Sequence, residues 1–216
     1  MFGFWSSTSA RASVLYCLTM QIKPLKFQEL EGISRDQLEQ HHDVLYAGYV
    51  KKIGEIQEQL ASAKTDGANG TYSELGELMR QQSFAYNGVS LHEWYFENLT
   101  SGGTEPSADI KSAIEARWGN WDSFITIFKA AGLAARGWVV LAYSAFDGEL
   151  QLFAQDAHDK GAAWASMPLL IMDVYEHAYM IDYGVKRKDY IEAFFKNVDW
   201  QVVSKRFATV RDWKLN

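Results

Sequence analysis

The chain has a single cysteine, three prolines and no long apolar run, and each shortage excludes a class of protein. With Cys17 alone, no internal disulfide can form, and a metal centre built from several thiolates is excluded. No stretch approaches the roughly 18 apolar residues of a membrane span. Acidic and basic residues are mixed along a chain of net charge −6, without a basic patch. We therefore expect neither a membrane nor a nucleic acid as partner.

Aromatic residues are abundant, with 8 Trp, 11 Tyr and 12 Phe among 216 residues. A chain of this length can bury a sizeable core over one or two domains without disulfides. Residues 1–19 differ from the rest, since Arg11 is their only charged residue. We interpret residues 1–19 as a leader or a mis-assigned start outside the fold. If Met20 is the true start, the protein is expected in the cytoplasm; if residues 1–19 are a targeting peptide, it is organellar or exported.

Residues 20–102 are predicted to form a helical-hairpin domain. Capping boxes at 34–37 and 71–74 each precede a stripe of apolar residues at three- and four-residue steps. A turn-rich break at 64–70 separates the two stripes, so the helices should pack antiparallel. Thr100 to Pro106 is the most linker-like stretch, and we place the domain boundary there.

Residues 103–216 are predicted to form an α+β metal-binding domain. Asp147-Gly148 is a hairpin signal between two strand-like runs. The expected helices cover 108–118, 121–135, 187–197 and 199–212, and the expected strands cover 138–145, 149–154 and 168–172. The fold class is therefore α+β: an N-terminal antiparallel helical hairpin, then a small three-stranded antiparallel sheet flanked by helices.

Four side chains from separate segments form a candidate metal site. Asp173 and His177 follow the apolar strand 168–172, while His41 and His92 lie in the apolar stripes of the two hairpin helices. Each histidine taken alone is more simply a core residue. Three imidazoles and one carboxylate together suit iron, manganese or zinc, and a cation would offset the cost of burying the aspartate. His42, about 100° further round the helix, is interpreted as a surface or interface residue.

Several separate motifs between Met20 and the C-terminus resemble the iron/manganese superoxide dismutases. Asp173 to Tyr179 reads D-V-Y-E-H-A-Y, similar to the family signature D-x-W-E-H-A-Y with tyrosine where tryptophan is usual. His41 with Tyr49 matches the first ligand helix, and Leu91 to Phe96 matches the second. Gly137-Trp138 matches the start of the G-W-x-W-L strand. Arg187 to Tyr190 and Asn197 to Trp200 match the C-terminal R-x-x-Y and N-x-x-W motifs.

The resemblance implies that one iron or manganese ion per subunit is held by His41, His92, Asp173 and His177. The open coordination position would take solvent or substrate. The implied reaction converts superoxide and protons to dioxygen and hydrogen peroxide while the ion cycles between +3 and +2. Tyr49 is implied to help deliver protons. Iron and manganese both accept this ligand set, so the sequence does not choose between them.

The resemblance also implies a residue that hydrogen-bonds the solvent held by the metal and so tunes its potential. The family usually has a glutamine there, from the second ligand helix or from beyond the second strand. Gly88 occupies the helix position, and counting along the strand puts His158 at the other position. Gln155 is the alternative, although it needs a shifted loop. Trp138 is expected to wall the cavity, and Tyr175 to pack against the site.

Two residues that the family usually has near the substrate entrance are replaced together. Leu45 stands for a histidine and Met180 for a tyrosine. Glu176, which in the family bonds a ligand histidine of the partner subunit, is retained, so we expect a homodimer with an altered interface. The double replacement leaves an alternative open, a metal-binding derivative with weak or lost catalysis. A different metal-dependent oxidoreductase is a third possibility.

Overall fold

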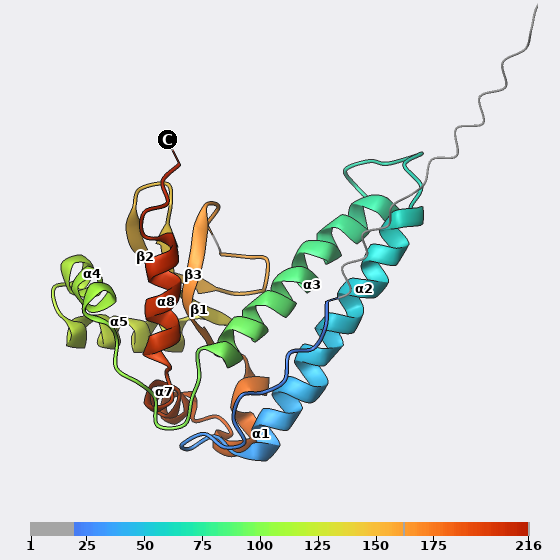
Figure 1. Cartoon of the computed structure of the whole chain (residues 1–216). Helices are drawn as coiled ribbons and strands as arrows, with labels where there is room; N and C mark the ends of the chain where they lie inside the picture. Colours follow the sequence, from blue (N-terminus) through green and yellow to red (C-terminus); the bar gives the residue numbers. More distant parts are fainter. Residues whose placement is uncertain (1–19, 162, 216) are drawn as a thin grey trace, which may run out of the picture.

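The computed structural model describes residues 20–161 and 163–215 (Figure 1). The interpretations of residues 1–19 lie outside this range. The molecule has a pair of long helices beside a compact part in which helices flank a small sheet. Within the described residues, no helix is both long and apolar enough to cross a membrane.

The first part is the predicted antiparallel helical hairpin. Its first arm contains α1 (Arg35–Glu39), a π-helical segment η1 (Gln40–Tyr46) and α2 (Ala47–Ser62), and its second arm is α3 (Glu74–Glu97). Ser34 caps the first arm, because its side chain accepts a hydrogen bond from the Gln37 backbone N–H. The second capping box was placed two residues too early, since Ser73, and not a residue at 71, caps α3.

The π-helical segment was not predicted, and it changes what its residues face. A π turn inserts extra backbone into an α-helix and shifts the side chains that follow it. Within this segment His41 and His42 are both buried, 1 % and 4 % exposed. The interpretation of His42 as a surface residue is wrong, because the segment preceding α1 covers it. His42 Nε2 lies 2.8 Å from the Lys23 backbone oxygen.

The sheet has the order β2-β1-β3 and is antiparallel throughout. It consists of β1 (Trp138–Ser144), β2 (Glu149–Gln155) and β3 (Ser166–Asp173). Every residue of the central strand β1 is buried, which explains its nearly unbroken apolar sequence. At one end of the sheet Trp138 pairs with Gln155 on one side and with Asp173 on the other. This end of the sheet carries the candidate site.

Helices cover the sheet, and the predicted α+β class is confirmed. Near β1 and β2 lies α5, and α8 packs beside β3 (Figure 1). The helices of this part are α4 (Ala108–Trp118), α5 (Trp121–Ala134), α7 (Arg187–Lys196) and α8 (Trp200–Val210), with the short η2 (Glu176–Ala178) and α6 (Met180–Tyr183) after β3. The two short elements were not predicted, because three or four residues are too few to show a helical period.

Buried asparagines join the hairpin to the sheet. Asn98, at the end of α3, accepts a hydrogen bond from the Ile171 backbone N–H at 2.9 Å and donates to the Tyr95 carbonyl at 3.0 Å. Asn197 donates to the Glu31 carbonyl at 2.8 Å. The Asn98 bonds fix the end of α3 relative to β3, so a side chain of the hairpin can meet one from the end of the strand, while the Asn197 bond joins the end of α7 to the segment before α1. The division into two domains remains an interpretation of the sequence.

Candidate metal centre

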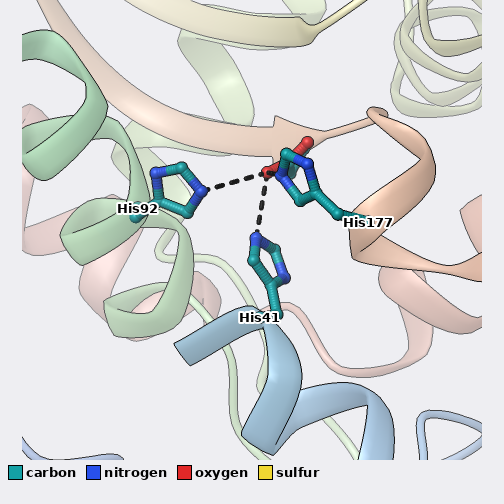
Figure 2. A group of neighbouring side chains, drawn as sticks. His41, His92 and His177 are labelled. Atoms are coloured by element: carbon teal, nitrogen blue, oxygen red, sulfur yellow. Dashed lines mark hydrogen bonds and ion pairs between the residues drawn. The ribbon is translucent and has the colours of Figure 1, made fainter. Parts of the chain in front are cut away.

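The carboxylate of Asp173 is the centre of a buried cluster of three histidines (Figure 2). Asp173 Oδ2 lies 3.0 Å from His41 Nε2, 3.1 Å from His177 Nε2 and 3.7 Å from His92 Nε2. His41, His92 and Asp173 are at most 1 % exposed, while the side chain of His177 is 28 % exposed. The cluster is therefore closed on the hairpin side and open beside His177.

The four side chains come from four different elements. His41 projects from the π-helical segment, His92 from α3, Asp173 from the last residue of β3, and His177 from the 3-10 turn that follows. Sequence analysis named these four residues, and the structure places one possible ligand atom from each within 4.8 Å of the others. Atoms that share one ion at about 2.1 Å lie roughly 3–4 Å apart, so the cluster is slightly wider than a filled site.

His92 gives the test of whether a cation fits. Its Nδ1 lies 2.6 Å from the Gly88 carbonyl oxygen, so the ring proton sits on Nδ1 and the lone pair on Nε2. Nε2 points at the Asp173 carboxylate, is buried, and has no hydrogen-bond partner among residues 20–161 and 163–215. A buried acceptor aimed at a carboxylate is unfavourable unless a cation lies between them. The residues present fit a metal ion.

The pKa values of the cluster follow from burial and from the Asp173 charge. Burial lowers the pKa of His41 and, more strongly, that of His92, so both rings are neutral near pH 7. Burial also raises the pKa of Asp173, but attraction and hydrogen bonds from His177 and His41 outweigh burial and hold it well below its usual value. Burial lowers the pKa of His177, but the Asp173 carboxylate overcomes this and the net shift is upward.

Tyr49 and His158 meet beside the cluster. His158 Nε2 lies 2.7 Å from the Tyr49 hydroxyl, and the Trp138 indole N–H donates to His158 Nδ1 at 2.9 Å. His158 is 2 % exposed, and burial lowers its pKa. Burial, followed by the nearby charges of Tyr175 and Asp173, raises the pKa of Tyr49 to about 12, so its hydroxyl keeps its proton at neutral pH.

Gly88 occupies the helix position where the family has a glutamine, and Gln155 was the alternative to His158 at the strand-side position. Gln155 is buried at the end of β2, and its side-chain oxygen has no hydrogen-bond partner. A Cβ at Gly88 would lie 2.7 Å from Cδ1 of Tyr49, so the tyrosine ring fills the space that a side chain on α3 would need. Of the two strand-side candidates, His158 is the one that contacts Tyr49.

Trp138 and Tyr175 line the same side of the cluster. The Trp138 ring is fully buried and meets His92 edge to face at 5.0 Å between ring centroids. Tyr175 stacks on His177 at 5.2 Å, and its backbone N–H donates to Asp173 Oδ1 at 2.9 Å. Both positions agree with the placement expected from the sequence.

The surface beside His177 combines exposed apolar side chains with Glu176 and Arg187. Met180 is 49 % exposed and Glu176 is also exposed, whereas Leu45 is partly buried. A hollow of about 370 Å³ lies here, lined by Leu133, Glu176, Tyr179, Met180, Gly184, Val185 and Arg187. Arg187 donates to the Tyr179 hydroxyl at 3.1 Å and to the Ala135 carbonyl at 2.8 Å, so its guanidinium is held in place.

Sequence reasoning missed several residues that hold the site from behind. Tyr190 donates to the backbone oxygen of Asp173 at 2.7 Å, and Tyr95 lies 3.1 Å from Tyr190, hydroxyl to hydroxyl. Asn87 donates to the His158 carbonyl at 3.0 Å. Tyr190 belongs to the matched R-x-x-Y motif, which gave a signal without a role. No pattern in the sequence pairs Asn87 with a loop 71 residues away.

Comparison with known proteins gives a consistent result. Residues 106–206 match the family model described as iron/manganese superoxide dismutases, C-terminal domain. The chain is 48 % identical over 187 residues to a superoxide dismutase [Fe] of Aquifex pyrophilus, covering 85 % of this chain and 88 % of that protein. It is 36 % identical over 187 residues to a superoxide dismutase [Mn] of Halobacterium salinarum, covering 85 % and 92 %. The chain belongs to the iron/manganese superoxide dismutases.

Proposed function

We propose that this protein is a superoxide dismutase in which His41, His92, Asp173 and His177 hold one iron or manganese ion per subunit. When bound, the ion supplies one-electron chemistry, alternating between +3 and +2 as superoxide is converted to dioxygen and hydrogen peroxide. Three neutral imidazoles and one carboxylate give the site a single negative charge, which lowers the net charge of either oxidation state by the same amount. Relatives named for iron and for manganese leave the choice of metal open.

One observation carries this proposal. Nε2 of His92 is buried and unpaired, yet it faces the Asp173 carboxylate from 3.7 Å. A core histidine would use both ring nitrogens, as His42 does. The Gly88 carbonyl fixes the tautomer that presents a lone pair to an ion, an arrangement typical of histidine ligands.

Tyr49 is proposed to hold a proton at the edge of the site. Its hydroxyl stays protonated at neutral pH and accepts a hydrogen bond from His158. The opposite side of the His158 ring is occupied by Trp138, which excludes water from Nδ1. Because Nδ1 is blocked, His158 cannot take up a proton to replace one that it gives away, so a proton that leaves the Tyr49 hydroxyl must be replaced from a side of the hydroxyl other than that of His158.

A homodimer with Glu176 at the interface is part of this proposal. Three exposed apolar side chains lie in the same hollow as Glu176, with Leu133 51 %, Met180 49 % and Val185 89 % exposed, and a group of this kind marks a candidate interaction surface. Sedimentation equilibrium tests it. A twofold mass for the wild type and a monomer mass for Met180→Lys would support this surface as the interface, whereas a monomeric wild type would exclude it.

The function is tested by metal analysis of protein purified under native conditions, followed by a dismutation assay with each metal. Superoxide decay is followed by pulse radiolysis of the iron-loaded and the manganese-loaded protein. We expect about one ion per subunit and decay faster than the free-metal background with at least one of them. Stoichiometric metal without such decay would favour the derivative with weak or lost catalysis. Leu45→His with Met180→Tyr would then be expected to raise turnover.

A further inference from the structure

The side chain of His158 has one donor and one acceptor, and both are in use. The Trp138 indole can only donate, so His158 Nδ1, 2.9 Å away, has no proton. The proton of the neutral ring is therefore on Nε2, which donates to the Tyr49 hydroxyl at 2.7 Å. Trp138, His158 and Tyr49 form a hydrogen-bonded series in which each side chain donates to the next. The hydroxyl hydrogen of Tyr49 is the one donor of this series that has no acceptor within it.

The hydrogen bonds of His158 are more sensitive to the position of the side chain than those of a glutamine in its place would be. A glutamine amide has two N–H donors and one acceptor, so it can bond Tyr49, Trp138 and a third group together. The imidazole of His158 has no spare donor. A hydrogen bond is lost beyond about 3.5 Å, so a shift of His158 by about an ångström breaks the series.

Two contacts outside the series hold the backbone of the His158 loop. Asn87, from α3, donates to the His158 carbonyl at 3.0 Å. On the other side the Tyr175 hydroxyl donates to the Asp156 carbonyl at 3.0 Å. Tyr175 also stacks on His177, so this second contact links the loop directly to the segment that carries Asp173 and His177.

We propose that Tyr175 is a positioning residue, whose hydroxyl holds the loop at Asp156 so that His158 donates to Tyr49. The tryptophan of the D-x-W-E-H-A-Y signature has no hydroxyl to make this bond. In this chain the tyrosine at 175 bonds the same loop that carries the histidine at 158. The proposal rests on the proposed function, because it concerns residues that act on the bound ion.

The test is a double-mutant cycle on the metal-loaded protein, with Tyr175→Phe and His158→Ala alone and together. Tyr143→Phe is the matched control, since its hydroxyl also donates to a backbone carbonyl, that of Arg211 at 2.8 Å, at the far end of β1. The measurements are dismutation rate, the electron paramagnetic resonance spectrum of the resting ion, metal content and melting temperature.

We expect Tyr175→Phe to retain its metal, to lower the dismutation rate about fivefold and to shift the resonance spectrum in the same direction as His158→Ala. Adding Tyr175→Phe to His158→Ala should change neither further. Tyr143→Phe should match the wild type in rate and spectrum, although both phenylalanine variants lower the melting temperature.

Two results would overturn the proposal: a Tyr175→Phe protein with wild-type rate and spectrum, or an equal loss in both backgrounds. The second would show that Tyr175 acts independently of His158. If the wild-type protein shows no dismutation at all, the proposed function fails, yet the spectral cycle still decides whether Tyr175 acts through His158.

Discussion

Two polar clusters, one around His41 and one around His42, meet the first arm of the hairpin at neighbouring residues, and they differ in how their atoms are paired. In one, His41, His92 and His177 surround Asp173, and His92 Nε2 has no partner. In the other, His42 lies between the Lys23 carbonyl and the Asp43 carboxylate, at 2.8 Å and 2.6 Å. His41 and His42 are adjacent in sequence and equally buried. Pairing, and not residue type or burial, distinguishes a metal centre from structural polar packing.

The second cluster also has its own cation. Tyr46 donates to Glu93 at 2.8 Å, and the Lys23 ammonium lies 2.7 Å from the Glu93 carboxylate and 2.9 Å from that of Glu97. Arg206 approaches Glu97 to 3.0 Å. The carboxylates of Glu93 and Glu97 are therefore already paired with cationic side chains of the protein. Around Asp173 the described residues offer only imidazoles, which are better metal ligands when neutral.

Removing the charge at the centre of the first cluster is the strongest test of this comparison. We expect Asp173→Asn to lower metal affinity more than about 100-fold. An anionic ligand is lost, and the N–H groups of the asparagine amide can hydrogen-bond the imidazole nitrogens that the ion would otherwise use. Metal content after dialysis against a chelator, and the dismutation rate, are the measurements. His42→Gln is the control and should keep its metal. Wild-type metal content in Asp173→Asn would contradict the assignment of the centre.

The second cluster should affect stability without affecting metal. We expect His42→Ala to lower the free energy of unfolding of the metal-free protein by about 2 kcal/mol, because it opens a small cavity and unpairs the Lys23 carbonyl. Urea unfolding of both metal-free proteins measures this. Metal stoichiometry should stay that of the wild type. Loss of metal together with unchanged stability would mean that the two clusters had been assigned the wrong way round.

The four candidate ligands and most of the helices and strands could be predicted from the sequence. Asp173 and His177 follow a clear apolar strand, and His41 and His92 lie in apolar stripes where a polar residue needs an explanation. Each signal depends on local periodicity, which one sequence shows well. The strands and the helices flanking the sheet were predicted for the same reason, since their apolar patterns are long enough to be read.

What the sequence did not show depends on backbone detail or on distant pairing. A π turn has no periodic signature of its own, so η1 was not predicted. The burial of His42 was missed because the covering segment, which includes Lys23, has no regular pattern. The cap of α3 was placed two residues too early, because Thr71 and Ser73 both offer a hydroxyl before the same helix. The hydrogen bond from Tyr175 to Asp156 is accepted by a backbone carbonyl, and every residue has one, so no sequence pattern predicts the partner.

Proton release on metal binding distinguishes His177 from the other two histidines of the first cluster. His41 and His92 are neutral near pH 7, whereas the pKa of His177 is raised by Asp173. A ligand imidazole must be deprotonated, so below the raised pKa of His177 the ion displaces about one proton. Affinity should then fall about tenfold per pH unit as the solution is acidified. Calorimetric titration in two buffers of different ionisation enthalpy counts the protons, and release of none, or of three, would contradict these pKa directions.

The smallest expected effect is that of Gly88→Ala, which should move the Tyr49 ring and leave the four metal ligands in place. At Gly88 a methyl group would meet Cδ1 of Tyr49 at 2.7 Å, so Gly88→Ala must push the ring away from His158. Because none of the four ligands moves, we expect full metal content with a dismutation rate reduced about three- to tenfold. Gly54→Ala is the matched control, since in α2 its new methyl group meets nothing within 4 Å. Gly54→Ala should keep its activity and gain up to about 1 kcal/mol of helix stability, and equal rates for the two variants would show that the Tyr49–His158 contact does not affect turnover.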